Sequence, residues 1–143
     1  MLNQIHEHIV KELGESSRTD TIFVLTAIVF NLIVLAVNSG VSTAAIEEDG
    51  NTSTYDIILT VFIVMTVLLN TVAVAALMLG RRTRRTLIEG LVAMYRDNQV
   101  DKYYDPSLMS NYGLRYLLFG GVIATLAITA IVVPLIIRFT DTG

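Results

Sequence analysis

The sequence contains no cysteine and no tryptophan, and only 2 of its 143 residues are proline. Without cysteine the chain forms no disulfide and no thiolate metal site, and it has no thiol nucleophile. Charge is also scarce, because Asp, Glu, Lys and Arg make up 16% of the residues, whereas they make up about a quarter of a soluble domain. The length is sufficient for one domain.

The scarcity of charge leaves three long uncharged runs, at residues 21–46, 57–80 and 116–137. Each reaches the roughly 20 apolar residues that a helix needs to cross about 30 Å of hydrocarbon. This pattern excludes a soluble globular protein, a porin-type barrel and a disordered chain. We therefore expect an all-α integral membrane protein with three transmembrane helices.

The chain then divides as one membrane domain, residues 1–143. The predicted segments are a cytoplasmic amphipathic helix (1–20), transmembrane helices at 21–41, 57–80 and 116–137, an external loop (42–56), a cytoplasmic helical segment (81–115) and an external tail (138–143).

The orientation follows from the positions of Lys and Arg. Residues 81–115 carry seven of the ten basic residues, whereas residues 39–56 carry none. The sequence therefore predicts a multi-pass protein of the cell membrane with a cytoplasmic N-terminus and an external C-terminus. Cleavage of the first span as a signal peptide is the alternative, but the apolar stretch 21–37 is longer than a signal core of about 7–15 residues.

The first 20 residues show two local signals. Leu2, Ile5, Ile9 and Leu13 share one helical face and Gly14 follows them, which predicts a short amphipathic helix at the membrane interface or against a partner. The tetrapeptide 17–20 resembles a capping box that opens the first span. After the second span, we expect either about four more turns of the same helix or a separate helix close behind it.

The three predicted spans contain no Asp, Glu, Lys, Arg or His. Proton relays, voltage sensors and intramembrane hydrolases normally need such residues, so we expect no enzyme, no proton-coupled transporter and no cofactor. His6 and His8 lie two apart but have no third ligand at a suitable spacing, so no metal site is predicted.

Amides and hydroxyls are the polar groups of the spans. At about 1.5 Å per residue, Asn31, Asn70 and Thr125 fall at nearly one depth, close to the middle of the bilayer. We favour hydrogen bonding between helices, and the alternative is a polar pore lining in an oligomer. The residues of this predicted layer are Asn31, Asn38, Asn70, Thr125 and Thr129.

Small residues indicate close helix packing, within or between subunits. Gly121 precedes Thr125 and Thr129 at four-residue spacing, with Gly120 and Ala124 beside it, and Ala76 and Gly80 form a shorter version on the second span.

A basic cluster follows the second span directly. Its four arginines are expected to contact anionic lipid headgroups at the cytoplasmic surface: Arg81, Arg82, Arg84 and Arg85. Four acidic residues in the same segment dilute this charge and argue against nucleic acid as a partner.

Together these features favour a non-enzymatic membrane protein that acts through helix–helix assembly, as a homo-oligomer or as an accessory subunit of a membrane complex. A homo-oligomeric channel lined by the Asn and Thr residues is the alternative. The Tyr- and Met-rich stretch 94–112 is expected to pack against the N-terminal helix, a neighbouring subunit or a partner protein.

Overall fold

The computed structural model describes the backbone of residues 2–47, 53–100 and 107–140, and the side chains of 3–47, 53–100 and 113–140. This part of the chain forms three α-helices: α1 (Leu2–Glu47), α2 (Ser53–Asp97) and α3 (Ser107–Thr140). Each of them contains a stretch that is long and apolar enough to cross a membrane. The predicted all-α fold with three candidate spans is therefore confirmed.

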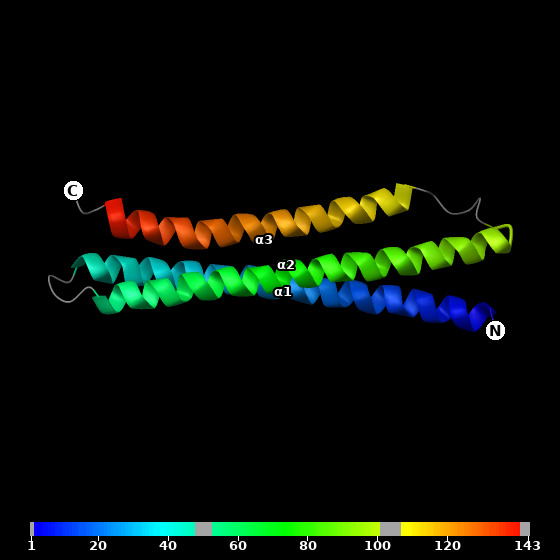
Figure 1. Cartoon of the computed structure of the whole chain (residues 1–143), viewed down its shortest axis with the longest axis horizontal. Coiled ribbons are helices and arrows are strands. Elements are labelled where there is room, and N and C mark those ends of the chain that lie inside the picture. Colours follow the sequence, from blue (N-terminus) through cyan, green and yellow to red (C-terminus); the bar gives the residue numbers. More distant parts are fainter. Residues whose placement is uncertain (1, 48–52, 101–106, 141–143) are drawn as a thin grey trace.

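The helices lie side by side along one long axis (Figure 1). α1 and α3 run in the same direction and α2 runs in the opposite direction. One end of the bundle, called here the N-terminal end, holds the start of α1, the end of α2 and the start of α3. The other, the C-terminal end, holds the end of α1, the start of α2 and the end of α3.

Two predictions about the first 20 residues differ from the structure of α1. α1 is a single helix through Gly14, so a separate amphipathic helix ending there is not seen, and Ser17 lies inside a helix rather than at a cap. A glycine in a helix costs about 1 kcal/mol relative to alanine. Packing of the first turns against the end of α2, where the rings of His6 and Tyr95 lie 5.8 Å apart, favours the continuous helix nonetheless.

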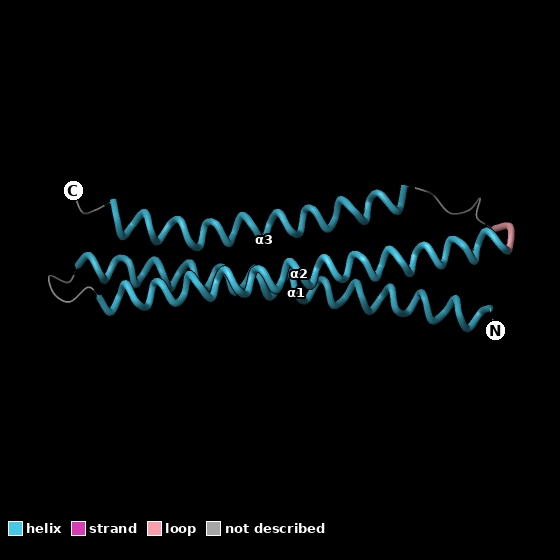
Figure 2. The backbone as a smooth tube through the Cα atoms, in the orientation of Figure 1, coloured by secondary structure: helices cyan, strands magenta, loops and turns pink. Residues whose placement is uncertain are grey.

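α2 continues beyond Gly80 to Asp97, which is the first of the two arrangements that the sequence allowed. The helix closes with a turn in which the amide of Val100 donates to the carbonyl of Tyr95 and Gln99 adopts a left-handed φ of 58°. Figure 2 shows this turn as the short loop after a continuous helical tube.

The buried positions are spaced by three or four residues on α1, by three, four or seven on α2, and by four or seven on α3. Such a 3.5-residue repeat is typical of helices that pack with a left-handed twist around a shared seam. The seam consists of Asp20, Val24, Ala27, Asn31, Val34, Asn38, Ser42 and Ala45 on α1, Leu59, Thr66, Asn70, Ala73, Leu77, Arg84, Ile88 and Leu91 on α2, and Tyr116, Ile123, Ala130 and Pro134 on α3.

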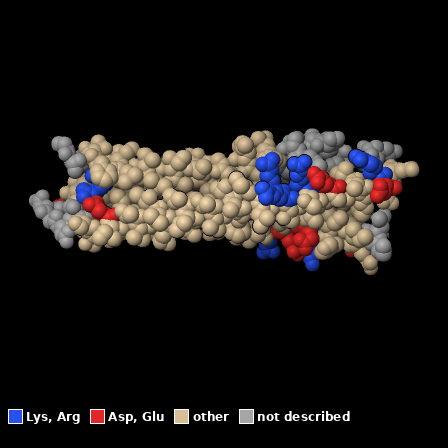
Figure 3. Space-filling view, viewed as in Figure 1, with Lys and Arg blue, Asp and Glu red and all other residues tan. Residues whose placement is uncertain are grey.

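The exterior has the opposite character from this seam. Large apolar side chains such as Leu117, Leu79 and Ile57 are 70%, 66% and 64% exposed. Figure 3 shows a long uncharged band on the visible face, with charged groups gathered near its two ends. A continuous apolar surface of this extent is unfavourable in water and favourable in lipid, which is compatible with a small membrane protein.

Candidate functional site

Polar side chains lie along the axis of the bundle at three levels, and we call them together the polar axis. The N-terminal level consists of Asp20, Arg84 and Tyr116, the middle level of Asn31, Asn70 and Thr66, and the C-terminal level of Asn38 and Ser42. All eight side chains belong to residues that are no more than 8% exposed.

The N-terminal level joins all three helices through one carboxylate. A guanidinium nitrogen of Arg84 on α2 lies 3.2 Å from Oδ2 of Asp20 on α1. The hydroxyl of Tyr116 on α3 donates a hydrogen bond to the same oxygen. The Arg84 guanidinium also lies over the Tyr116 ring, 5.6 Å from its centroid. The three residues thus form a closed set of contacts in which the two opposite charges compensate each other.

Gly80 makes room for this set. A Cβ atom built on Gly80 collides with Oδ1 of Asp20, and the carboxyl carbon lies 3.3 Å from it. Gly80 therefore serves a close helix contact, as its small size suggests, and this contact lies within the chain, between α2 and α1. Ala76, one turn earlier, is half-buried on the same helix.

The placement of Arg84 corrects one expectation. Its side chain is 4% exposed and paired with Asp20, so it does not reach lipid headgroups with its neighbours. Sequence reasoning also treated Asp20 only as a capping residue. The signal that could have found both is the repeat itself, because Asp20 precedes Val24 and Ala27 at spacings of four and three, and Arg84 follows Leu77 by seven.

The middle level is a reciprocal pair of amides. Nδ2 of Asn31 donates to Oδ1 of Asn70 at 2.8 Å, and Nδ2 of Asn70 donates to Oδ1 of Asn31 at 2.9 Å. Each Nδ2 also donates to a carbonyl of its own helix, that of Ala27 at 2.8 Å and that of Thr66 at 2.7 Å. All the amide N–H groups of the pair therefore have acceptors.

Thr125 and Thr129 lie apart from this pair. Thr125 is exposed on α3, and the Thr129 hydroxyl donates to the Thr125 carbonyl at 2.9 Å. The structure thus brings together two of the three residues that were expected at one depth. The reason is the direction of the α3 face, because Ile123 and not Thr125 points into the seam.

The C-terminal level differs from the other two. Asn38 and Ser42 are both 0% exposed. Among the residues that the structure describes, the amide atoms of Asn38 and the hydroxyl of Ser42 have no hydrogen-bond partner. Asn38 does share a face of α1 with Asn31, but this face points into the bundle, away from any lumen between subunits.

A partly exposed ion pair closes the C-terminal end beside this level. Arg138 donates to both carboxylate oxygens of Asp56, at 2.9 Å from Nε and 3.3 Å from Nη2. These groups lie just outside the apolar runs 57–80 and 116–137. The hydrogen bond from Arg138 lowers the pKa of Asp56 below its ordinary value, and the same bond raises the pKa of Arg138.

The remaining predicted residues lie at the surface. Arg81, Arg82 and Arg85 are exposed, and Nε of Arg85 lies 2.8 Å from the Glu89 carboxylate. Ala124 is exposed too, and no atom outside the local helix lies within 4 Å of a Cβ built on Gly120 or Gly121. None of these three small residues therefore serves a close contact between helices in the described structure.

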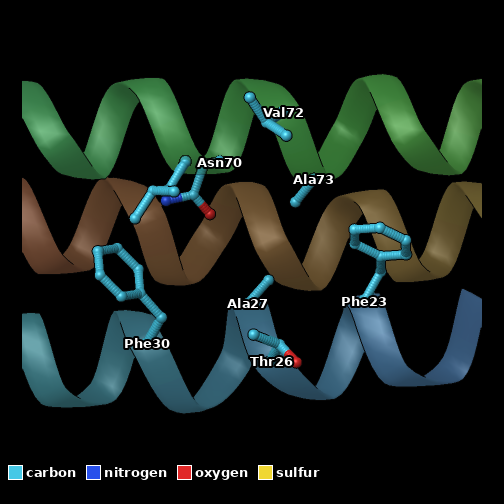
Figure 4. Close-up of a pocket in the computed structure, with 8 residues that line it drawn as sticks. Phe23, Thr26, Ala27, Phe30, Asn70, Val72 and Ala73 are labelled. Atoms are coloured by element: carbon cyan, nitrogen blue, oxygen red, sulfur yellow. The ribbon is translucent and has the colours of Figure 1, made fainter.

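Two apolar grooves adjoin the amide pair. One, of about 170 Å³, lies between α1 and α2, and Figure 4 shows Phe23 and Phe30 at its two sides with Ala27 and Asn70 between them. The other, of about 380 Å³, lies between α2 and α3. In the described part of the chain, no group of three His, Asp or Glu residues is placed to hold a metal ion.

No protein family, no curated protein and no solved structure matches this chain. The geometry of the polar axis therefore indicates its role. That geometry is one of mutual bonding, because Asp20, Arg84, Asn31 and Asn70 each contact another member of the axis.

Proposed function

We propose that the chain is a non-enzymatic integral membrane protein that acts through helix–helix assembly, as a homo-oligomer or as an accessory subunit of a membrane complex. The observation that carries this proposal is the use of polar groups within the chain. Asp20 pairs with Arg84 and Asn31 pairs with Asn70, and all four are buried, so they fix the register of α1 against α2 rather than face a substrate.

The proposed orientation places the N-terminal end of the bundle in the cytoplasm. Seven of the ten basic residues belong to residues 81–115, and the charged groups of the visible face are most numerous at this end (Figure 3). Basic residues near the ends of spans remain on the cytoplasmic side. The C-terminus is then external, in a protein of the cell membrane.

The outward face of α3 is the surface that we propose for assembly. Gly121 and Thr125 are exposed and four residues apart, and no atom outside the local helix lies within 4 Å of a Cβ at Gly121. Small residues on one face let a second helix approach closely, where dispersion contacts and weak hydrogen bonds hold it. Large side chains cover most of the remaining exterior.

A homo-oligomeric channel is the second candidate, and the structure limits the residues that can line its lumen. Asn31 and Asn38 lie inside a single bundle, so a lumen between subunits has to be lined by another face. Thr125 on the outward face of α3 is the polar side chain of the predicted layer that such a lumen can use. This version predicts ion flux that changes in Thr125→Val, whereas the assembly function requires no flux.

The absence of cysteine allows a direct test of the assembly face. Single cysteines are placed at Thr125 and, as controls, at the enclosed Ile123 and at Leu68 on the exposed face of α2. Under oxidation in native membranes, Thr125→Cys is expected to give a covalent dimer and the two controls are not. The mass of the intact protein in nanodiscs, by native mass spectrometry, gives the oligomeric number.

A discrete oligomer that cross-links at Thr125 supports the homo-oligomer. A monomer without cross-linking contradicts it and leaves the accessory subunit, whose partner then appears as a heterologous cross-link at the same position. Flux into liposomes that depends on Thr125 favours the channel.

A further inference from the structure

A stripe of residues on α2 leads from the middle of the uncharged band to its N-terminal end. Its members are spaced by four and three residues alternately, so they share one helical face. The stripe begins with apolar residues and Thr71 and ends with two arginines: Val67, Thr71, Val74, Met78, Arg81 and Arg85.

A corresponding stripe on α3 faces it. At one end, Val67 and Val74 of α2 line the groove of about 380 Å³ together with Ala124 and Ile128 of α3. At the other end, a guanidinium nitrogen of Arg81 lies 3.5 Å from the position of a Cβ on Gly113 of α3. The groove and the arginine therefore belong to the same α2–α3 face.

Gly120 keeps this face open between those two ends. No atom outside the local helix lies within 4 Å of a Cβ built on Gly120, and α3 lies less closely against α2 than against α1. The polar groups that border the groove are already bonded, because the Thr71 hydroxyl donates to Val67 at 2.7 Å and Asn70 pairs with Asn31. The wall of the groove is therefore apolar and suits an apolar occupant.

The dimensions fit one leaflet of a bilayer. From Arg81, Val74 is seven residues away and Thr71 ten, which is about 10 to 15 Å along a helix. One leaflet supplies about half of the roughly 30 Å of hydrocarbon. A headgroup at Arg81 therefore places its acyl chain alongside the groove.

We propose that the α2–α3 face binds one anionic phospholipid from the leaflet at the N-terminal end of the bundle. Its phosphate lies against Arg81 and Arg85, and one acyl chain follows the groove past Val74 to Ala124. Charge complementarity favours this occupant over a helix of a second copy. Both arginines are exposed, and Figure 3 shows Lys and Arg side chains gathered where the uncharged band ends on this side.

The test measures lipid retention by native mass spectrometry of the full chain, released from nanodiscs that contain equal amounts of phosphatidylglycerol and phosphatidylcholine. The wild-type protein is expected to retain one phosphatidylglycerol, at least tenfold over phosphatidylcholine. The double variant Arg81→Gln/Arg85→Gln is expected to lose this preference. The matched control Arg18→Gln/Arg82→Gln removes the same charge from α1 and from another face of α2, and it is expected to keep the preference.

A second pair of variants tests the groove with all arginines intact. Ala124→Phe fills the groove and is expected to reduce retention at least tenfold, whereas Val122→Phe, on the opposite side of α3, leaves it unchanged. Equal retention of both lipids by the wild type overturns the proposal, as does equal loss in both arginine double variants. A doubled mass that disappears in Ala124→Phe assigns the groove to a second copy and overturns it as well.

Discussion

Two asparagines of α1 show how much a buried amide depends on its surroundings. Asn31 and Asn38 lie seven residues apart on one helical face, and both are enclosed, at 1% and 0% exposed. Asn31 has a full set of hydrogen bonds through Asn70, whereas the amide of Asn38 has no partner among the described residues. The difference lies in the neighbouring helices and not in α1.

The register of the bundle explains the difference. α1 and α2 are antiparallel, so two turns beyond Asn31 correspond to two turns before Asn70, where α2 carries the apolar Ile63. α3 runs parallel to α1, and the pairing of Asp20 with Tyr116 places Pro134 at the level of Asn38. Proline has no N–H to donate. The middle level therefore joins two helices, whereas the C-terminal level leaves its amide alone.

The N-terminal level differs from the two amide levels because it contains a buried pair of opposite charges. Asp20→Ala is expected to destabilise the bundle by about 3–5 kcal/mol, because it leaves the Arg84 guanidinium buried without a counter-charge. Thermal unfolding in detergent, followed by circular dichroism, measures the loss. The double variant Asp20→Leu/Arg84→Met removes both charges and should recover most of the stability. A single variant that unfolds with the wild type would show that the three-helix contact is not formed.

Gly80→Ala sharpens this result without removing a charge. The added methyl group meets the carboxylate of Asp20, so a loss of about 1–3 kcal/mol is expected from overpacking. Gly90→Ala on the same helix is the control, because nothing lies within 4 Å of its Cβ and alanine favours a helix by up to about 1 kcal/mol. Equal shifts in the two unfolding temperatures would contradict the close contact of Gly80 with Asp20.

The two asparagines themselves give the next test. Asn31→Leu strands the amide of Asn70 and is expected to cost about 0.6–2 kcal/mol, the range of hydrogen bonds between membrane helices. Asn38→Leu removes an enclosed amide without a described partner, so the same substitution should raise the unfolding temperature. The unfolding temperatures of both variants and the wild type, measured in the same detergent, give the two effects. A loss in Asn38→Leu as large as that in Asn31→Leu would remove the distinction between the two levels.

Much of this fold is predictable because the bilayer dictates it. Runs of 22 or more uncharged residues have to be helical in lipid, since each backbone N–H and C=O needs an internal partner there. The proximity of Asn31 and Asn70 follows from depth alone, because antiparallel helices of similar length bring equal depths together. Depth does not specify direction around a helix, which is why Thr125 was expected in a layer that it does not join.

The buried ion pair was missed for a related reason. Asp20 and Arg84 lie just outside the uncharged runs, so a division of the chain by hydropathy assigns them to water. The 3.5-residue repeat continues past that division and carries both into the seam. A search for spans stops at the first charge, whereas helix packing continues as long as the repeat does.

The ion pair between Asp56 and Arg138 at the C-terminal end gives the smallest effect, and this effect depends on pH. The hydrogen bond from Arg138 lowers the pKa of Asp56. The ion pair therefore contributes its full stability above the ordinary carboxyl pKa, and this stability is lost as the pH falls through the lowered pKa of Asp56. Because the Asp56 side chain is 49% exposed, water and salt screen the pair, so the expected shift in unfolding temperature is small and decreases with salt. Asp56→Asn should remove this acid-dependent part. Since Asp56 is one of several carboxylates, the measurement is the difference between wild type and variant on going from neutral to acidic pH. A difference that stays constant would show that the pair does not hold α3 to α2.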